Sequence, residues 1–255
     1  MNIKKIIQAA EAGGKILKDY FGKGMDAVQK SVASDFYTKA DLDSERATLD
    51  VLRREFPGFN IFSEEDGKTD KDSEYTFVID PMDGTNNFVI GIPDFSVSIA
   101  LFKNDEAIAG VINVPMLGHT YYAKRSEGAF FKGTKLRVNK ERDIQKSTVL
   151  YTCGYKITRE VLDKAIAGLH KINVKRVLLN WSPAAGFCLL ASGKIEAIVN
   201  DRNEFYDYAA GKLIAREAGA KVTDLAGEED LDDKNDAFLA SNGTEIHEKI
   251  IKCFA

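Results

Sequence analysis

Cysteine and histidine are scarce in this chain of 255 residues, and neither is arranged as a functional site. The three cysteines, Cys153, Cys188 and Cys253, are odd in number and far apart, which argues against a disulfide framework or a zinc site. We interpret them as buried thiols of a cytosolic protein. The three histidines are equally scattered, so a histidine general base or histidine metal ligand is not expected.

Long basic runs and long apolar stretches are also missing. No basic run of five or more residues occurs and the formal net charge is −4, so a nucleic-acid partner is not expected. Charged residues such as Glu11 and Lys15 interrupt the apolar N-terminus, so neither a signal peptide nor a membrane span is expected there. The expected compartment is the cytoplasm. The hydrophobic fraction of 44% is that of an ordinary globular protein.

The most informative segment is the sequence DPMDGT at residues 80–85, which follows the apolar run 77–79. Pro81 biases Asp80 toward extended backbone, so Asp80 should end a strand with its carboxylate beyond the sheet edge. Gly84 permits a tight turn, and a helix that begins near Thr85 would offer free N–H groups to an oxyanion. Two carboxylates beside such a site would repel each other unless cations lay between them. The segment therefore suits metal-assisted phosphate chemistry, although a plain strand-turn-helix corner with solvated acids is the alternative.

Two further acidic segments favour the metal-site interpretation. Glu64 and Glu65 follow the apolar stretch 59–62, which again places acids just after a short predicted strand. Asp207 lies among aromatic and small residues where a helix is predicted to begin. Each has an ordinary structural alternative, since the glutamates could lie in a solvated loop and Asp207 could cap its helix. All three segments together make the ordinary alternatives less convincing.

These segments resemble the signatures of one protein family. Residues 80–101 resemble the first signature of the inositol monophosphatase family, part of a larger group of magnesium-dependent, lithium-sensitive phosphatases that includes fructose-1,6-bisphosphatases. Residues 207–211 resemble the second signature, W-D-x-A-A-G, with Tyr206 in place of tryptophan. The resemblance runs from the first helix to residues 241–243. An N-terminal segment resembles the family's catalytic segment through Lys30, Ser31, Asp35, Thr38 and Asp41.

The resemblance implies a set of oxygen ligands for two Mg²⁺ ions, with a weaker third ion near Glu64. Hard oxygen donors are the ligands that magnesium prefers. Asp80 would bridge the two ions, and Glu65 would belong to the same acidic shell as a catalytic residue. The implied metal ligands are Glu64, Asp80, the backbone carbonyl of Met82, Asp83 and Asp207.

The implied reaction is hydrolysis of a phosphate monoester by direct attack of a metal-activated water. One divalent ion would activate the attacking water while the other stabilises the leaving alkoxide. The resemblance gives Thr85 and Asp41 a catalytic role, because the Thr85 hydroxyl, polarised by Asp41, would orient the water. Thr38 and Asp41 also have the spacing of a helix capping box, which is the alternative role for Asp41. No Ser/His/Asp or Cys/His arrangement is apparent in the sequence, so a phosphoenzyme is disfavoured.

Substrate choice depends on residues that vary around this site. Inositol 1-phosphate is the expected substrate, and fructose-1,6-bisphosphate, histidinol phosphate, 3′-phosphoadenosine 5′-phosphate and NADP stay open. Trp181 and Pro183 alter the rim relative to relatives with strong inositol preference, and we expect Trp181 to be a packing residue. The implied substrate-binding residues are Asp83, Gly84, Thr85, Ser182, Ala184, Asn200 and Asp207. A homodimer is implied, and a role as an RNA-polymerase or ribosomal-RNA maturation partner is the alternative of another class.

Periodicity and the resemblance together predict an α/β (α+β) fold, a layered αβαβα sandwich with the site between its lobes. The larger, mostly antiparallel lobe should span residues 1–145 and the smaller α/β lobe residues 146–255. The acidic residues 228–236 should form a solvated surface turn. Helices are expected near 3–21, 41–56, 158–171, 183–192, 207–218 and 244–253. Strands are expected near 75–80, 94–102, 106–114, 119–124, 128–138, 174–179, 195–200 and 237–240.

Overall fold

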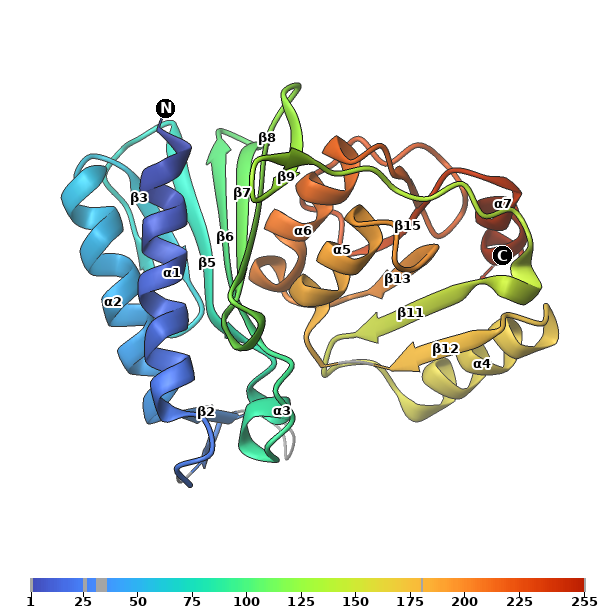
Figure 1. Ribbon diagram of the computed structural model, residues 1–255, viewed down its shortest axis with the longest axis horizontal. Helices are drawn as coiled ribbons and strands as arrows, with labels where there is room; N and C mark the ends of the chain where they lie inside the picture. Colours follow the sequence, from blue (N-terminus) through green and yellow to red (C-terminus); the bar gives the residue numbers. More distant parts are fainter. Residues whose placement is uncertain (1, 25–26, 31–35, 180, 255) are drawn as a thin grey trace.

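The computed structural model of the chain describes residues 2–24, 27–30, 36–179 and 181–254. Within them, helices and sheets alternate in five layers, as Figure 1 shows from left to right. The helices α1 and α2 are followed by a large sheet, then by α5 and α6, then by a smaller sheet, and finally by α4 and α7. The predicted αβαβα sandwich is therefore confirmed.

The larger sheet has eight strands in the order β10-β9-β8-β7-β6-β5-β3-β4. Neighbouring strands run antiparallel except β3 and β5, which pair in parallel. The prediction of a mostly antiparallel sheet is thus correct. The strands are β3 (Asn60–Ser63), β4 (Gly67–Thr69), β5 (Tyr75–Asp83), β6 (Ser96–Lys103), β7 (Glu106–Val114), β8 (His119–Lys124), β9 (Gly128–Phe131) and β10 (Thr134–Lys135).

One face of the larger sheet is covered by α1 (Ile3–Tyr20) and α2 (Lys39–Glu55). Apolar residues of α1 recur at helical spacing and are fully buried, including Ile6, Ala10 and Leu17. They pack on β-strand residues that point to the same side, such as Phe77 and Ile79 of β5. A short ribbon of β1 (Ala27–Gln29) and β2 (Phe36–Thr38) leads into α2, and the short elements α3 (Thr85–Val89) and η1 (Pro115–Leu117) lie at strand ends.

The smaller sheet has five strands in the order β12-β11-β13-β15-β14. Strands β12, β11 and β13 pair in parallel, whereas β15 runs antiparallel to both its neighbours. The sheet is sandwiched by α4 and α7 on its outer face and by α5 and α6 on its inner face. Its elements are η2 (Ile144–Lys146), β11 (Thr148–Cys153), α4 (Arg159–Lys171), β12 (Arg176–Leu179), α5 (Pro183–Ala191), β13 (Ala197–Asp201), α6 (Phe205–Glu217), β14 (Lys221–Asp224), β15 (Ala237–Ser241) and α7 (Glu245–Ile251).

The helices α5 and α6 form a middle layer that joins the two sheets. Their side chains share one apolar core with Val78 and Ile112 of the larger sheet and with Leu150 and Phe238 of the smaller one. A division of the chain into lobes at residues 145 and 146 therefore stays a prediction, because this core belongs to both sheets. Within the described ranges, none of the helices combines the length and the apolar character needed to cross a bilayer.

The acidic segment 228–236 differs from its prediction as a solvated turn. Asp230 and Asp233 are each only 6% exposed. Lys212 of α6, itself buried, lies 2.8 Å from Asp230, and Asp233 contacts Arg125 and Arg216. The charge pattern alone suggested solvation, but cations supplied from distant positions in the chain pair with these carboxylates and make their burial possible. Strands β11 and β14 and the break between β9 and β10 were also missed.

Candidate metal centre and phosphate site

A β-bulge at the end of β5 brings two aspartates to the same face of the larger sheet. Asp80 pairs with Ser98 and Asp83 with Ser96, so three steps along β5 match only two along β6. In a regular strand, residues three apart would point to opposite faces. The extra residue of the bulge reverses that alternation, so both carboxylates point toward the middle helical layer.

Asp207 reaches the same point from the first turn of α6. Its carboxylate accepts a hydrogen bond from the backbone N–H of Glu204 (3.1 Å), so it caps the helix as the sequence allowed. The helix lies close to the larger sheet because β7 carries Gly110 opposite Ala210. A Cβ atom at Gly110 would lie 2.8 Å from the Ala210 carbonyl oxygen, closer than packed atoms approach. Glycine here lets α6 approach the sheet and brings Asp207 to β5.

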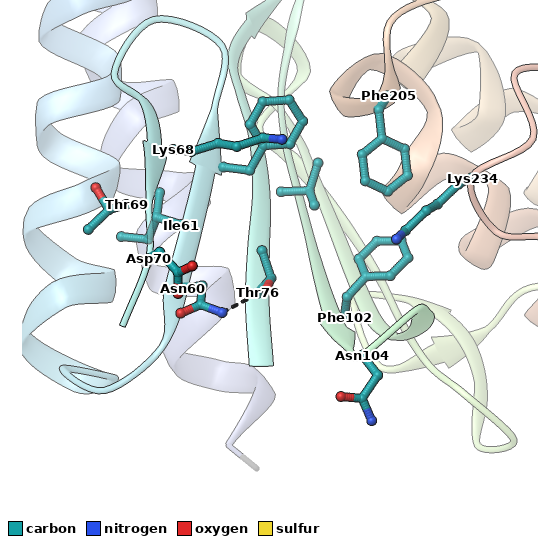
Figure 2. A pocket seen from close by; sticks show the side chains of 12 residues that line it. Asn60, Ile61, Lys68, Thr69, Asp70, Thr76, Phe102, Asn104, Phe205 and Lys234 are labelled. Atoms are coloured by element: carbon teal, nitrogen blue, oxygen red, sulfur yellow. Dashed lines mark hydrogen bonds between the residues drawn. The ribbon is translucent and has the colours of Figure 1, made fainter. Parts of the chain in front are cut away.

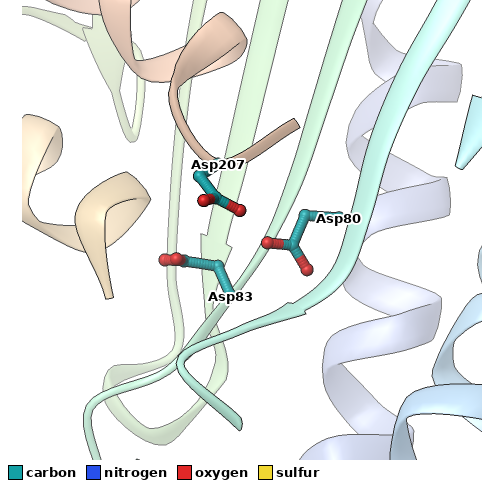
Figure 3. A group of neighbouring side chains, drawn as sticks. All are labelled: Asp80, Asp83 and Asp207. Atoms are coloured by element: carbon teal, nitrogen blue, oxygen red, sulfur yellow. The ribbon is translucent and has the colours of Figure 1, made fainter. Parts of the chain in front are cut away.

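The three aspartates form a compact acidic cluster (Figure 3). One carboxylate oxygen from each of Asp80, Asp83 and Asp207 lies within 4.8 Å of the others. Burial, together with the charges of the neighbouring acids, raises the pKa values of Asp80 and Asp207 well above their usual range. Closely spaced buried carboxylates need a cation between them, and their donors are all hard oxygens of the kind that Mg²⁺ binds.

Asp83 is held in place by hydrogen bonds from the larger sheet and from the start of α5. Its Oδ2 atom accepts hydrogen bonds from the Ser182 hydroxyl (2.6 Å), the Ser96 hydroxyl (2.9 Å) and the backbone N–H of Ala184 (3.0 Å). Burial nevertheless raises the pKa of Asp83 to about 7. Ser182 and Ala184 were predicted to bind substrate, but their described contacts instead orient Asp83.

Glu64 lies just beyond β3 and lines the same pocket as the three aspartates. Lys30 lies between the two glutamates, with its Nζ atom 2.8 Å from Glu64 Oε1 and in contact with Glu65. Burial, and next the charge of Glu64, raises the pKa of Glu65 to about 7. Glu65 is not among the residues that line the pocket. Ser31 and Asp35, which the family resemblance singled out with Lys30, lie outside the described residues.

Asp41 has the hydrogen-bond partners that each of its two alternative roles requires, and its catalytic role stays a prediction. Its Oδ2 atom accepts hydrogen bonds from the N–H and hydroxyl of Thr38, each 2.7 Å long, which completes the capping box of α2. Its Oδ1 atom accepts the Thr85 hydroxyl at 3.0 Å. The Met82 carbonyl lies equally close to that hydroxyl, whose single proton can serve one acceptor at a time. Burial raises the pKa of Asp41 to about 6.

Gly84 precedes α3 in a left-handed conformation, with φ at 100°. A Cβ atom there would lie 3.0 Å from the Asp94 carbonyl oxygen and 3.2 Å from the Ser182 Cβ atom. Both the backbone angle and the close approach require glycine. The turn places Thr85 next to the acidic cluster, where both Gly84 and Thr85 line the pocket.

The pocket at this cluster has a volume of about 350 Å³, which leaves room for a small ligand beside the acids. Its lining also includes Tyr155, Arg159 and Trp181, which the sequence did not assign to substrate. Trp181 was expected to be a packing residue, yet its side chain is 56% exposed and lines the pocket. Tyr155 and Arg159 follow β11, a strand that the sequence pattern did not reveal, so no signal pointed to them.

Asn200 does not lie at the pocket where the resemblance placed it. It is fully buried in β13, where its amide donates to the Asp236 carbonyl (2.7 Å) and accepts from Asn203 (2.9 Å). Counting back seven residues from Asp207 reaches the interior of the strand instead of its end. Asn203, which begins the approach to α6, lines the pocket in its place.

Comparison with known proteins agrees with this geometry. The family model described as the inositol monophosphatase family matches residues 2–255. A Thermotoga maritima protein named fructose-1,6-bisphosphatase/inositol-1-monophosphatase is 34% identical over 243 residues, covering 94% of this chain and 90% of that protein. Nus factor SuhB of Pasteurella multocida is 35% identical over 227 residues, covering 86% of this chain and 83% of that protein. The crystal structure of extragenic suppressor protein suhB from Bartonella henselae has a TM-score of 0.91 at 29% identity, covering 99% of this chain and 97% of that one.

Proposed function

The chain belongs to the inositol monophosphatase family, and from that premise we propose that it is a Mg²⁺-dependent phosphomonoesterase whose preferred substrate is inositol 1-phosphate. The observation that carries the proposal is the cluster of Asp80, Asp83 and Asp207, of which the first two are buried and the third partly buried, in the lining of a pocket large enough for a small phosphorylated polyol. A buried cluster of like charges has an evident use only when cations neutralise it.

The donor set fits magnesium. Asp80, Asp83, Asp207 and Glu64 would hold the ions together with the Met82 carbonyl, and all of these groups are hard oxygens. Bound Mg²⁺ would supply charge neutralisation for the phosphate and a nucleophile at neutral pH. Lys30 pairs with Glu64 and Glu65, so its ammonium group would compete with a cation for these carboxylates.

Thr85 and Asp41 would handle the proton of the attacking water. When the Thr85 hydroxyl donates to Asp41 Oδ1, its oxygen lone pairs are free to accept a hydrogen bond from water. Asp41 accepts without moving, because Thr38 fixes its other oxygen. Asp41 is fully buried, whereas Thr85 lines the pocket and can meet the water there. The interaction of Asp41 with the Thr85 hydroxyl should strengthen as charge develops.

Fructose-1,6-bisphosphate is the second candidate substrate, and Arg159 favours it. Arg159 lines the same pocket as the acidic cluster and would be available to a second anionic group on a substrate whose first phosphate lies at Thr85. The Thermotoga maritima relative carries both activities in its name. Inositol 1-phosphate has no second phosphate, so the arginine would contribute less to its binding.

A panel of phosphomonoesters compared by kcat/KM tests the proposal. We expect Mg²⁺-dependent phosphate release from inositol 1-phosphate, and none from Asp207→Asn. Arg159→Gln should lower kcat/KM for fructose-1,6-bisphosphate about tenfold more than for inositol 1-phosphate. Arg142→Gln, on an exposed arginine that pairs with Glu245, is the matched control. Equal losses for both substrates would remove Arg159 as the discriminating residue.

The alternative to an enzyme is a role as an RNA-polymerase or ribosomal-RNA maturation partner, and the relatives named Nus factor SuhB keep that alternative open. A protein that acts only through its surface has no need of a functional acidic cluster. Phosphate release that is Mg²⁺-dependent and lost in Asp207→Asn would favour the enzyme, whereas a purified, folded protein inactive on the whole panel would favour the partner role. The proposal includes a homodimer, which sedimentation equilibrium of the purified chain tests.

A further inference from the structure

A second cleft lies along the same sheet face as the metal centre but is separate from it. Its volume is about 370 Å³, within the range of about 300–1,000 Å³ typical of small-molecule sites. The larger sheet supplies one wall, and Phe205 of α6 with Lys234 of the loop before β15 supplies the other. Figure 2 shows the two walls facing each other across the cleft.

The walls of the cleft are aromatic. Phe102 and Phe205 have ring centroids 5.1 Å apart, and Phe62 stacks on Phe205 at 6.4 Å. All three rings line the cavity. Aromatic faces at these separations favour a planar apolar group beside them.

Two lysines extend into the cleft from opposite sides (Figure 2). The Lys68 Nζ atom lies 5.0 Å from the Phe62 ring centroid, and among the described residues Lys68 makes no ion pair. Lys234 pairs with Asp105 at 2.5 Å, but the Asp105 side chain is 87% exposed, so this pair is weak. The cleft also includes Asp70, whose Oδ1 atom accepts the backbone N–H of Asp72.

We propose that this cleft is a regulatory site for a small ligand with a planar apolar body and an acidic group. The rings would contact the planar body, and the two ammonium groups would pair with the acid. Such a ligand would bridge the larger sheet and α6, because Lys68 and Phe62 belong to the sheet while Phe205 belongs to the helix.

The same elements connect the cleft to the proposed metal centre, so this regulation rests on the proposed function. Each of three lining residues precedes a proposed metal ligand by two positions in the chain. The three pairs are Phe62 with Glu64, Val78 with Asp80, and Phe205 with Asp207. Val78 and Asp80 are two apart in β5 and so point to the same face of the sheet, whereas the other two pairs are only close along the chain, just after β3 and in the first turn of α6. A ligand that holds α6 against the sheet at Phe205 would also hold Asp207 beside Asp80, which favours cation binding.

The fluorescent probe 8-anilinonaphthalene-1-sulfonate, which has a planar naphthalene ring system and one sulfonate, tests the site on the full chain. We expect saturable binding that weakens about tenfold in the double variant Lys68→Gln/Lys234→Gln. The neutral analogue N-phenyl-1-naphthylamine should bind the two proteins equally. Lys132→Gln is the matched control, because Lys132 also lies over an aromatic ring, 5.1 Å from the Phe131 centroid, but outside the cleft.

The coupling is tested by measuring the Kd of the probe with saturating Mg²⁺ and with EDTA. Mg²⁺ should lower the Kd of the probe at least about threefold, and linkage requires the probe to lower the Kd of Mg²⁺ by the same factor. Unchanged probe binding in the double lysine variant would overturn the site. If Mg²⁺ leaves the Kd of the probe unchanged or raises it, the coupling is overturned. If calorimetry shows no Mg²⁺ binding at all, the proposed function fails, while the lysine variants still decide the cleft.

Discussion

Replacing Asp41 by asparagine separates catalysis from helix capping, because the two carboxylate oxygens have different partners. Oδ2 serves the Thr38 capping box and Oδ1 accepts the Thr85 hydroxyl. Asparagine can keep its oxygen at Thr38, which caps equally well, and it then points an NH₂ group at Thr85. The Thr85 hydroxyl would have to accept from that group and donate to the Met82 carbonyl. It could no longer relay a proton to residue 41.

The expected loss is in kcat and not in substrate binding. Removal of a group that handles the proton of the nucleophile costs about 10²–10⁴ in rate. KM and the affinity for Mg²⁺ should change little, since the lost interaction strengthens only in the transition state. Thr85→Ala should show the same pattern. Asp43→Asn is the control, because Asp43 lies on the same helix but pairs with Lys39.

Asp41→Asn should lower kcat, but it should leave the free energy of unfolding unchanged or raise it. The pKa of Asp41 is about 6 in the folded protein against about 3.9 when unfolded, which corresponds to about 3 kcal/mol of destabilisation of the carboxylate above pH 6. A raised pKa means that this destabilisation is absent below pH 4 and complete above pH 6. Urea unfolding of metal-free Asp41→Asn at pH 8 should therefore show equal or greater stability than wild type, by up to about 3 kcal/mol. Near-normal kcat in Asp41→Asn would refute the catalytic role and leave only the cap.

Three further predictions concern metal binding, pH and packing. Asp80→Asn, Asp83→Asn and Asp207→Asn should each weaken Mg²⁺ binding in calorimetry and nearly abolish turnover; normal values for Asp207→Asn would remove it from the site. Burial lowers the pKa of His247 from 6.5 to about 4, so the free energy of unfolding should be highest above pH 6.5 and about 2 kcal/mol lower at pH 5. Urea titrations of His247→Gln should not show this fall. Gly110→Ala should cost about 1–3 kcal/mol, because its Cβ would lie 2.8 Å from the Ala210 carbonyl oxygen, and an unchanged urea midpoint would contradict that.

The sequence allowed the fold to be predicted where apolar periodicity was regular. The helix α1 lies close to its predicted bounds because its buried positions repeat at helical spacing. The strands β6 and β7 also lie close to their predicted bounds, although nearly all of their residues are buried. The strand β11 was missed although Val149 to Tyr151 are fully buried. Its apolar stretch has only these three residues, too few to distinguish a strand from another buried segment. The short edge strand β14 offers too few residues for a pattern.

The candidate site was predictable only as far as its local motifs extend. Asp80 and Asp83 stand in one motif, but the bulge that turns both to one face is a property of the pairing with β6. The position of Asn200 and the packing role of Trp181 were predicted incorrectly, because distance along the chain does not specify where a strand ends or which way a loop turns. Arg159 belongs to no motif and depends on the packing of α4 beside β11.

The arrangement of the three aspartates bears on how the fold would bind cations. Asp207 comes from a different element than Asp80 and Asp83, so repulsion among the three acts to separate α6 from the larger sheet. The apolar core that α6 shares with both sheets, and its close approach at Gly110, oppose that separation. Part of the repulsion is relieved by protonation, as the raised pKa values of these acids indicate. Cation binding would replace those protons and remove the remaining repulsion. Mg²⁺ would therefore tie α6 to the sheet as well as serve catalysis.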